Sequence, residues 1–270
     1  MKNKLHIYLI SAIMLVFTAS SCNKDDDGPS FNLFSVEDDK QLGAELNQEI
    51  KNNEQQYNLM DPAQYPDAYS HLRRIRDSIL NTGLVDYDEK FVWEVYLMNN
   101  DTTLNAFATP GGYMYFYTGL INFLDNEAEF AGVMGHEMAH AAERHSTNQL
   151  TKVYGIQILL SVALGEDPSQ LAEIAAGLAS GLATLAFSRN HEYEADEYAV
   201  KYLNPTSYDA RGVAGFFEKL EGTQPVPEFL STHPSPENRV EEIIALWEEL
   251  GAKEGNWYME SYNDFKATLP

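Results

Sequence analysis

Two histidines four residues apart have the spacing needed to hold one metal ion. His136 and His140 enclose Glu137 in the segment His-Glu-Met-Ala-His. On a helix, positions four apart differ by about 40° in azimuth, so both imidazoles project from one face. Glu137 lies one step round, where it can reach a metal-bound water without binding the metal. These residue types at this spacing indicate metal-assisted hydrolysis, with Glu137 as the general base.

One zinc ion is the expected cofactor, because a catalytic zinc site combines imidazole and carboxylate ligands with one open position. Glu192 is the expected third ligand. Asp196 shares its helix face, and we expect it to accept a hydrogen bond from the far nitrogen of a ligand histidine, which fixes the tautomer. Glu194 falls about 200° from Glu192 and is expected on another face. A buried structural helix or a solvated acidic helix is the alternative, and two such motifs in one chain disfavour both.

Other candidate ligands fit less well. His145 lies nine residues after His136, which is about 180° round a continuous helix, so it is expected to face away. A metzincin site requires Gly where Glu143 stands and His where Ser146 stands, so that pattern fails. His191 remains a weaker ligand candidate.

The elements that position these residues show two periodicities. Residues 91–98 alternate with period two and predict a strand. Asn105–Gly112 predicts a turn, and Tyr113–Tyr117 predicts a second strand. A tight hairpin is expected, because Pro110 cannot donate to a ladder and paired glycines permit unusual backbone angles.

The rest of the chain is mostly helical by pattern. Asn126, followed three residues later by Glu129, predicts a helix start. Residues 156–164 and 171–185 are apolar but too short to span a bilayer, which predicts buried or lid-like helices, with membrane-surface contact as the alternative. Further helices are expected at 36–56, 66–82, 191–203, 209–221 and 236–250.

The N-terminal residues have the pattern that is typical of an export signal. Lys2 and Lys4 precede the apolar run Leu5–Phe17, and Ala19–Ser21 leads into Cys22, the single cysteine of the chain. This ending resembles a bacterial lipobox, in which the cysteine becomes the lipidated N-terminus, so Cys22 is the expected lipid attachment site. An incidental cysteine in an ordinary signal peptide is the alternative.

Three segments are expected. Residues 1–21 form the signal peptide, 22–35 a lipidated flexible tether, and 36–270 a single metallopeptidase domain. The stretch Asn23–Asp27 resembles the acidic tag of surface-exported lipoproteins. We therefore expect an outer-membrane lipoprotein, periplasmic or surface-exposed, held at the membrane by its lipid. The net charge of -23 argues against nucleic-acid binding.

The motif pair resembles the HtpX-like and BepA-like zinc metallopeptidases, relatives of the CAAX prenyl proteases and the gluzincins. The likeness runs from Val92 to Arg239. Its further matching segments are Asn105–Tyr113, Arg144–His145, Ser188–Asp196 and Thr232–Pro234. The resemblance implies an α+β, zincin-like fold, with a small, mostly antiparallel sheet on one side of a cleft and a predominantly helical lobe on the other.

The resemblance also implies functional roles. It supports Glu192 as a zinc ligand, and it makes Tyr113–Tyr117 an edge strand to which an extended polypeptide substrate adds. Two roles are open for His233: it stabilises the oxyanion with Arg239 nearby, or it caps the zinc in a latent enzyme. A plain helix-entry residue is the structural alternative. The expected substrate-binding residues are Gly111, Gly112, Tyr113 and Tyr115.

The expected function is a zinc-dependent endopeptidase that cleaves envelope proteins, in protein quality control. The chain shows neither the transmembrane segments of HtpX-like members nor the helical repeats of BepA-like ones, so their substrates do not transfer directly. One alternative is a non-proteolytic envelope chaperone or adaptor lipoprotein that contains zinc. A second is a membrane-surface interaction protein that acts through residues 156–185.

Overall fold

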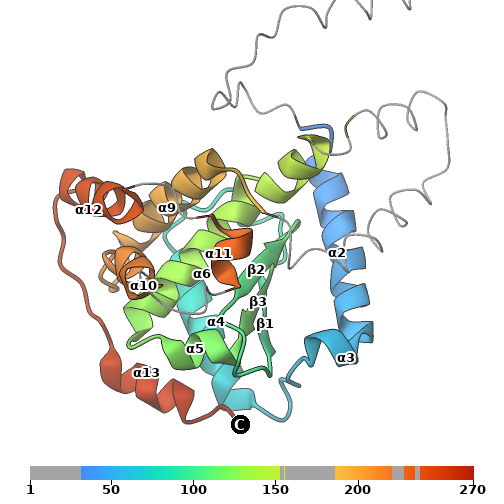
Figure 1. The fold of residues 1–270 in the computed structure, drawn as a ribbon, viewed down its shortest axis with the longest axis horizontal. Coiled ribbons are helices and arrows are strands. Elements are labelled where there is room, and N and C mark those ends of the chain that lie inside the picture. Colours follow the sequence, from blue (N-terminus) through green and yellow to red (C-terminus); the bar gives the residue numbers. More distant parts are fainter. Residues whose placement is uncertain (1–31, 153–154, 156–185, 221–227, 235–237) are drawn as a thin grey trace, which may run out of the picture. The chain divides into compact units, whose positions relative to one another are not determined.

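The computed structural model describes residues 32–152, 155, 186–220, 228–234 and 238–270, and its elements surround one small sheet (Figure 1). Helices and strands fall close to the positions that the sequence periodicity predicts. In chain order they are α2 (Val36–Asn52), α3 (Glu54–Tyr57), α4 (Pro66–Leu80), β1 (Glu94–Met98), β2 (Ala106–Thr109), β3 (Tyr113–Tyr117), α5 (Thr118–Phe123), α6 (Glu127–Ala142), α9 (Arg189–Leu203), α10 (Gly212–Leu220), α11 (Phe229–Thr232), α12 (Arg239–Glu249) and α13 (Met259–Lys266).

The sheet has three strands in the order β1-β3-β2. β1 pairs with β3 in parallel and β2 pairs with β3 antiparallel, so the sheet is mixed and not mostly antiparallel as expected. The expected hairpin exists, but its first strand is β2, which lies within the segment predicted as a turn. The turn itself is limited to residues 110–112, where Gly111 and Gly112 have φ values of 78° and 90°. Only glycine adopts this backbone without strain.

The two faces of the sheet pack against different partners. One face contributes to the main core, together with α4 and α6. The other face is aromatic and is covered by residues of α2 and α3, on the opposite side from the helical lobe (Figure 1). The members of this aromatic cluster are Ile50, Tyr57, Tyr96, Met98, Phe107, Tyr113, Tyr115 and Tyr117. Successive side chains of a strand point to opposite faces, so covering both faces buries neighbouring residues along the strand.

α6 is the central helix of the lobe, and every one of its residues is buried. It begins as the sequence predicts: the Asn126 side chain accepts a hydrogen bond from the Glu129 N–H and donates one to the Glu129 carboxylate. Small residues then allow close packing on α10. A Cβ on Gly132 would lie 2.7 Å from the backbone nitrogen of Val213. The predicted α+β fold, a small sheet beside a helical lobe, is confirmed.

Some predicted features lie outside the described residues: the export signal, Cys22, and the apolar segments 156–164 and 171–185. Within the part of the chain that the structure describes, no helix combines the length and the apolar character needed to cross a bilayer.

Candidate metal centre

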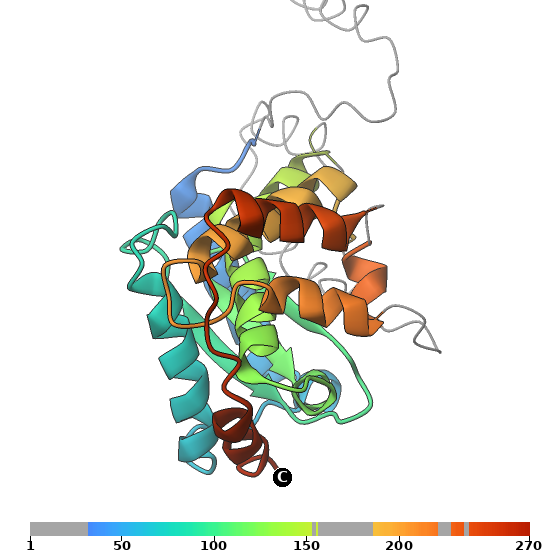
Figure 2. The same ribbon diagram turned by 90° about the vertical axis from the view of Figure 1, so that its left-hand side faces the viewer.

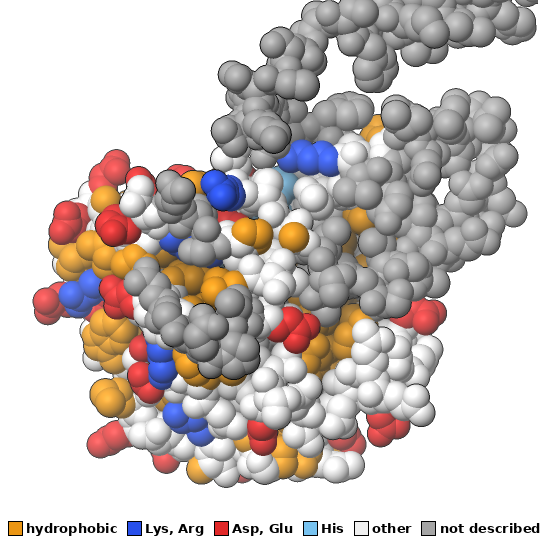
Figure 3. All heavy atoms as spheres, viewed as in Figure 1, with side chains coloured by type: hydrophobic (Ala, Val, Ile, Leu, Met, Phe, Trp, Pro, Cys, Tyr) orange, Lys and Arg blue, Asp and Glu red, His pale blue; other side chains and the backbone are white. Residues whose placement is uncertain are grey.

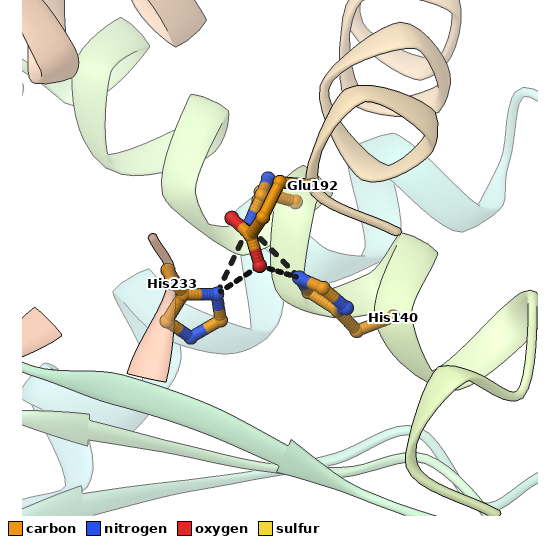
Figure 4. Close-up of side chains that lie close together, drawn as sticks. His140, Glu192 and His233 are labelled. Atoms are coloured by element: carbon orange, nitrogen blue, oxygen red, sulfur yellow. Dashed lines mark hydrogen bonds and ion pairs between the residues drawn. The ribbon is translucent and has the colours of Figure 1, made fainter. Parts of the chain in front are cut away.

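Four buried side chains from three elements converge on one point. α6 presents His136 and His140, α9 presents Glu192 from its first turn, and His233 follows the last residue of α11. One ligand atom from each lies within 4.8 Å of all the others. Figure 4 shows His140, Glu192 and His233 pointing toward one another from these separate elements. The site is therefore assembled by packing α9 and α11 against α6, the motif helix that carries His136 and His140.

The distances within this cluster suit a shared cation. The Nε2 atoms of His136 and His140 are 3.0 Å apart, and the Nδ1 atom of His233 lies 3.2 Å from His136 Nε2. One Glu192 oxygen lies 3.2 Å from His233 Nδ1 and 3.4 Å from His140 Nε2. Three imidazole nitrogens and a carboxylate form the donor set that zinc accepts in tetrahedral sites. The residues present thus fit one zinc ion.

The electrostatics of the site also call for positive charge. Burial alone would lower the pKa of His136, but hydrogen bonds and charges from Asp196 and Glu192 outweigh it and raise this pKa to about 9. Burial opposes ionisation of Glu192, yet the histidines around it hold its pKa well below the ordinary value. A buried Glu192 carboxylate that stays ionised requires positive charge close to it, and a bound cation would add to that of Arg239.

Behind the cluster, Asp196 and Arg239 contact the ligands. Asp196 Oδ1 lies 2.9 Å from His136 Nδ1, the nitrogen that faces away from the other ligands. Arg239 donates to both Asp196 oxygens, at 2.6 and 2.8 Å, and its guanidinium lies 3.1 Å from Glu192. Nε and one terminal nitrogen of Arg239 are engaged by these two carboxylates, while its Nη1 is buried and has no hydrogen-bond partner. A part for Arg239 near the oxyanion stays a prediction.

Glu137 is fully buried, and its carboxylate faces His233. Its Oε1 lies 3.4 Å from His233 Nε2, and neither of its oxygens has a hydrogen-bond partner. Burial raises the pKa of Glu137, opposed in part by the charges of His233 and His136 and by the backbone amide of Ala108 in β2, which lies near the carboxylate without meeting hydrogen-bond geometry. A buried carboxyl with a raised pKa is suited to accept a proton near neutral pH.

The predicted substrate strand needs a correction. Tyr113 and Tyr115 belong to β3, which is hydrogen-bonded on both sides and so offers no free edge. Gly111 and Gly112 form the turn before it. The strand nearest the motif helix is β2, an edge strand. Tyr117 N–H donates to Asn105 O, so by alternation the polar backbone groups of Ala106 and Ala108 point away from β3.

Sequence reasoning placed His145 on the wrong side of the helix. α6 ends at Ala142, and Arg144 has a φ of 58°, so the chain changes direction before helical backbone resumes at His145. His145 Nδ1 then lies 2.9 Å from His140 Nδ1. His145 is not part of the four-residue cluster, but it contacts a member of it from behind. The Arg144-His145 pair after the motif is the only sequence signal for this contact, and helical periodicity does not show that the chain changes direction there.

Comparison with known proteins agrees with this geometry. A model of peptidase family M48 matches residues 70–246. Mitochondrial metalloendopeptidase OMA1 of Arabidopsis thaliana is 34% identical over 197 residues, which cover 69% of this chain and 40% of that protein. Beta-barrel assembly-enhancing protease of Escherichia coli K12 is 34% identical over 165 residues, which cover 56% of this chain and 34% of that protein.

The alignment with a further relative covers a larger share of both proteins. The OMA1 metalloendopeptidase of Schizosaccharomyces pombe is 27% identical over 219 residues, which cover 79% of this chain and 62% of that protein. The chain spans less than half the length of the plant and Escherichia coli relatives. The family match covers the strands, the motif helix, α9 and the segment that carries His233 and Arg239. The chain belongs to peptidase family M48.

Proposed function

We propose that this chain is a zinc-dependent endopeptidase. The observation that carries the proposal is the placement of Glu137: a buried carboxylate with no hydrogen-bond partner beside a cluster of zinc-ligating side chains. Bound zinc supplies a Lewis acid that polarises the scissile carbonyl and acidifies water. A structural zinc site has no need of a buried, unpartnered carboxylate next to it.

Each residue has a distinct role in this proposal. His136, His140 and Glu192 hold the zinc, and Asp196 accepts the Nδ1 proton of His136 and so fixes its tautomer. Arg239 holds Asp196 and Glu192 in place. Glu137 takes a proton from the attacking water and delivers it to the leaving amine.

His233 is proposed to occupy the fourth ligand position in a latent form of the enzyme. Its Nδ1 lies among the ligand atoms, and its Nε2 lies 3.4 Å from Glu137, so it blocks both the open position and the base. It also follows a helix of only four residues, whereas the other three ligands lie on long helices that pack on each other. Activation then requires His233 to leave.

The role of His233 is tested by substitution. We expect His233→Ala to hydrolyse an unstructured protein such as casein several-fold faster than the unaltered enzyme, because three ligands and one open position remain. Hydrolysis and zinc content are measured on the same preparations. A loss of activity at full zinc content would instead assign His233 to stabilisation of the oxyanion.

The substrate is proposed to be a polypeptide bound in extended form along β2. Ala106 and Ala108 direct polar backbone groups away from β3. The Ala106 N–H donates to the Asn105 side chain, and the Ala108 amide lies near Glu137. A peptide added there as a fourth strand would pass beside the catalytic base. This proposal moves substrate binding from β3, where the sequence placed it, to β2.

A location in the cell envelope is also proposed. The predicted signal peptide 1–21, lipidated Cys22 and tether 22–35 would hold the domain 36–270 at the outer membrane, facing the periplasm or the surface. The Escherichia coli relative is a beta-barrel assembly-enhancing protease by name, which supports protein quality control in the envelope as the role. Figure 3 shows, on the part of this view that is not grey, acidic side chains with single lysines and arginines scattered among them. Nucleic-acid binding needs clustered basic side chains, so this surface does not suit it.

One observation favours a second candidate function. Four protein ligands around zinc are typical of a structural site, and a permanently bound His233 would suit a non-proteolytic chaperone or adaptor. Glu137→Gln separates the two. We expect it to retain one zinc per chain and to lose hydrolysis by at least about 10²-fold. Complementation of a gene deletion by this variant would support the adaptor instead.

A further inference from the structure

The end of the motif helix brings a fourth buried histidine against the back of a metal ligand. Arg144 adopts a left-handed φ of 58° and donates to the buried Asp39 of α2 and to the carbonyl of Phe34. This fixed change of direction places His145 under His140, which a continuous helix would not allow, since positions five apart differ by about 140°. The contact is therefore built by the tertiary structure.

His145 links His140 to a carboxylate at the surface. Its Nδ1 lies 2.9 Å from His140 Nδ1, and its Nε2 lies 3.0 Å from Glu194 Oε2. The His145 side chain is 1% exposed, whereas that of Glu194 is 48% exposed. The three groups form one hydrogen-bonded chain that starts at the ligand and ends in solvent.

The proton positions along this chain follow from its two ends. His140 uses Nε2 toward the metal cluster, so its Nδ1 carries the proton and must donate. His145 therefore accepts at Nδ1 and carries its own proton on Nε2, which it donates to Glu194. A carboxylate only accepts, so every donor in the chain has an acceptor. One arrangement of protons satisfies all three residues.

We propose that His145 is a positioning residue that orients His140 for the metal, with Glu194 fixing its tautomer. This inference rests on the metal site of the proposed function. It gives the two ligand histidines different supports: His136 has the Asp196–Arg239 carboxylate clamp, and His140 has a neutral imidazole. Such supports typically change metal affinity by 10- to 100-fold.

Packing around His145 allows the hydrogen bonds to be removed without changing the shape of the site. The His145 ring stacks on His191 at 4.4 Å between centroids and meets His140 edge-on at 4.9 Å. A phenylalanine keeps both ring contacts and loses both hydrogen bonds. An asparagine places a polar atom close to the position of Nδ1, and a glutamine places one close to that of Nε2.

The test compares these three substitutions in the Glu137→Gln protein, so that zinc affinity is measured without turnover. Competition with a chromophoric chelator gives the dissociation constant for zinc. We expect His145→Phe to weaken zinc binding at least 10-fold, His145→Gln to match it, and His145→Asn to stay within about threefold of the parent. Equal affinity in His145→Phe and the parent, or equal rescue by Gln and Asn, would overturn the proposal.

Nitrogen NMR of the zinc-loaded Glu137→Gln protein provides a second measurement that does not depend on how the His145 variants fold. We expect the His145 signals of a neutral ring with its proton on Nε2. A proton on Nδ1 would show that His145 donates to His140 and would overturn the proposal. Failure of the parent to bind zinc would refute the proposed function as well, whereas unchanged affinity in His145→Phe refutes this inference alone.

Discussion

At the scale of single residues, the site depends on the shape of the Arg239 side chain, which contacts Asp196 and Glu192 together. Arg239 is 3% exposed and binds Asp196 through two nitrogens, while the same guanidinium reaches Glu192. A lysine carries the same charge but lacks the planar fork. The orientation of two carboxylates around the cluster therefore depends on the shape of this side chain as well as on its charge.

We expect Arg239→Lys to weaken zinc binding by roughly 10-fold or more, because Asp196 and Glu192 lose their shared donor. Arg211→Lys is the matched control. Arg211 also binds one aspartate, Asp209, through two nitrogens, but it lies outside the metal cluster. Chelator competition should show an unchanged affinity for the control. An Arg239→Lys protein that binds zinc as tightly as the control would contradict the role given to Arg239.

A second residue-scale prediction concerns Glu143, directly after α6. Burial, followed by the nearby charges of Glu194 and Asp86, raises the pKa of Glu143 to about 7. Because the folded-state pKa is above the ordinary 4.5, the folded protein holds this proton more tightly and loses stability as pH rises from about 4.5 to about 7.

Glu143→Gln should therefore stabilise the protein at pH 8 by about 1 kcal/mol, after discounting for solvent screening, and have little effect at pH 4.5. Urea unfolding at both pH values measures the difference. Glu197→Gln, which breaks the exposed pair with Lys201, serves as the control and should change stability little at either pH. A Glu143→Gln effect that does not depend on pH would rule out this explanation.

At the scale of elements, the motif helix is held by close backbone contact with α10. A Cβ on Gly212 would lie 2.2 Å from the carbonyl oxygen of Ala128, whereas one on Gly215, on the same helix, would come no nearer than 3.4 Å to Glu129. Glycine is thus required at one of these positions and merely present at the other. The contact fixes how deeply α10 sits against the N-terminal half of α6.

We expect Gly212→Ala to reduce the free energy of unfolding by about 3 kcal/mol, because backbone must move to admit the methyl group. Gly215→Ala should be neutral or stabilising by up to about 1 kcal/mol, since alanine favours a helix. Chemical denaturation of both variants provides the comparison. Equal stability of the two would show that α10 adjusts without cost.

At the scale of the whole molecule, an ion pair between the buried Glu127 and the half-exposed Arg74 joins helices that are distant in sequence. Glu127, at the start of α6, accepts from Arg74 of α4, from Tyr208 and from Ser261 of α13. Figure 2 shows α13 beside the lower end of α4. The backbone carbonyl of Trp257 also accepts from the first N–H groups of α6. The C-terminal segment thus completes the start of the helix that carries the metal ligands.

Burial would raise the pKa of Glu127, but these hydrogen bonds outweigh it, so its pKa lies below the ordinary 4.5. Its stabilising contribution is therefore present above pH 4.5 and is lost as pH falls through the lowered value. We expect Glu127→Gln to lower the free energy of unfolding by roughly 1–3 kcal/mol at pH 7, with a smaller difference in acid.

Urea unfolding between pH 7 and pH 3 measures this dependence. Glu37→Gln breaks an exposed pair with Lys40 and should have almost no effect across the range. A Glu127→Gln protein as stable as the Glu37→Gln protein at pH 7 would show that the buried network does not join the helices energetically.

The sequence alone determined those features that depend on local geometry. The start of α6 at Asn126 follows from side-chain to backbone bonds three residues apart, and the shared face of His136 and His140 follows from helical period. The segment 66–82 was recognised by its apolar spacing and forms α4. Interactions within four residues are encoded by adjacent side chains, so pattern is sufficient to find them.

Tertiary structure alone decided the rest. Periodicity identifies Tyr113–Tyr117 as a strand but not its neighbours. β3 lies in the centre because β1 also pairs with it, each residue with a partner 19 positions later in the chain, as in Glu94 with Tyr113 (113 − 94 = 19). Arg239 and His145 likewise take their positions from contacts with α9, α2 and the motif helix. Long-range pairing and a single left-handed residue change which groups meet, and neither leaves a periodic signal in the sequence.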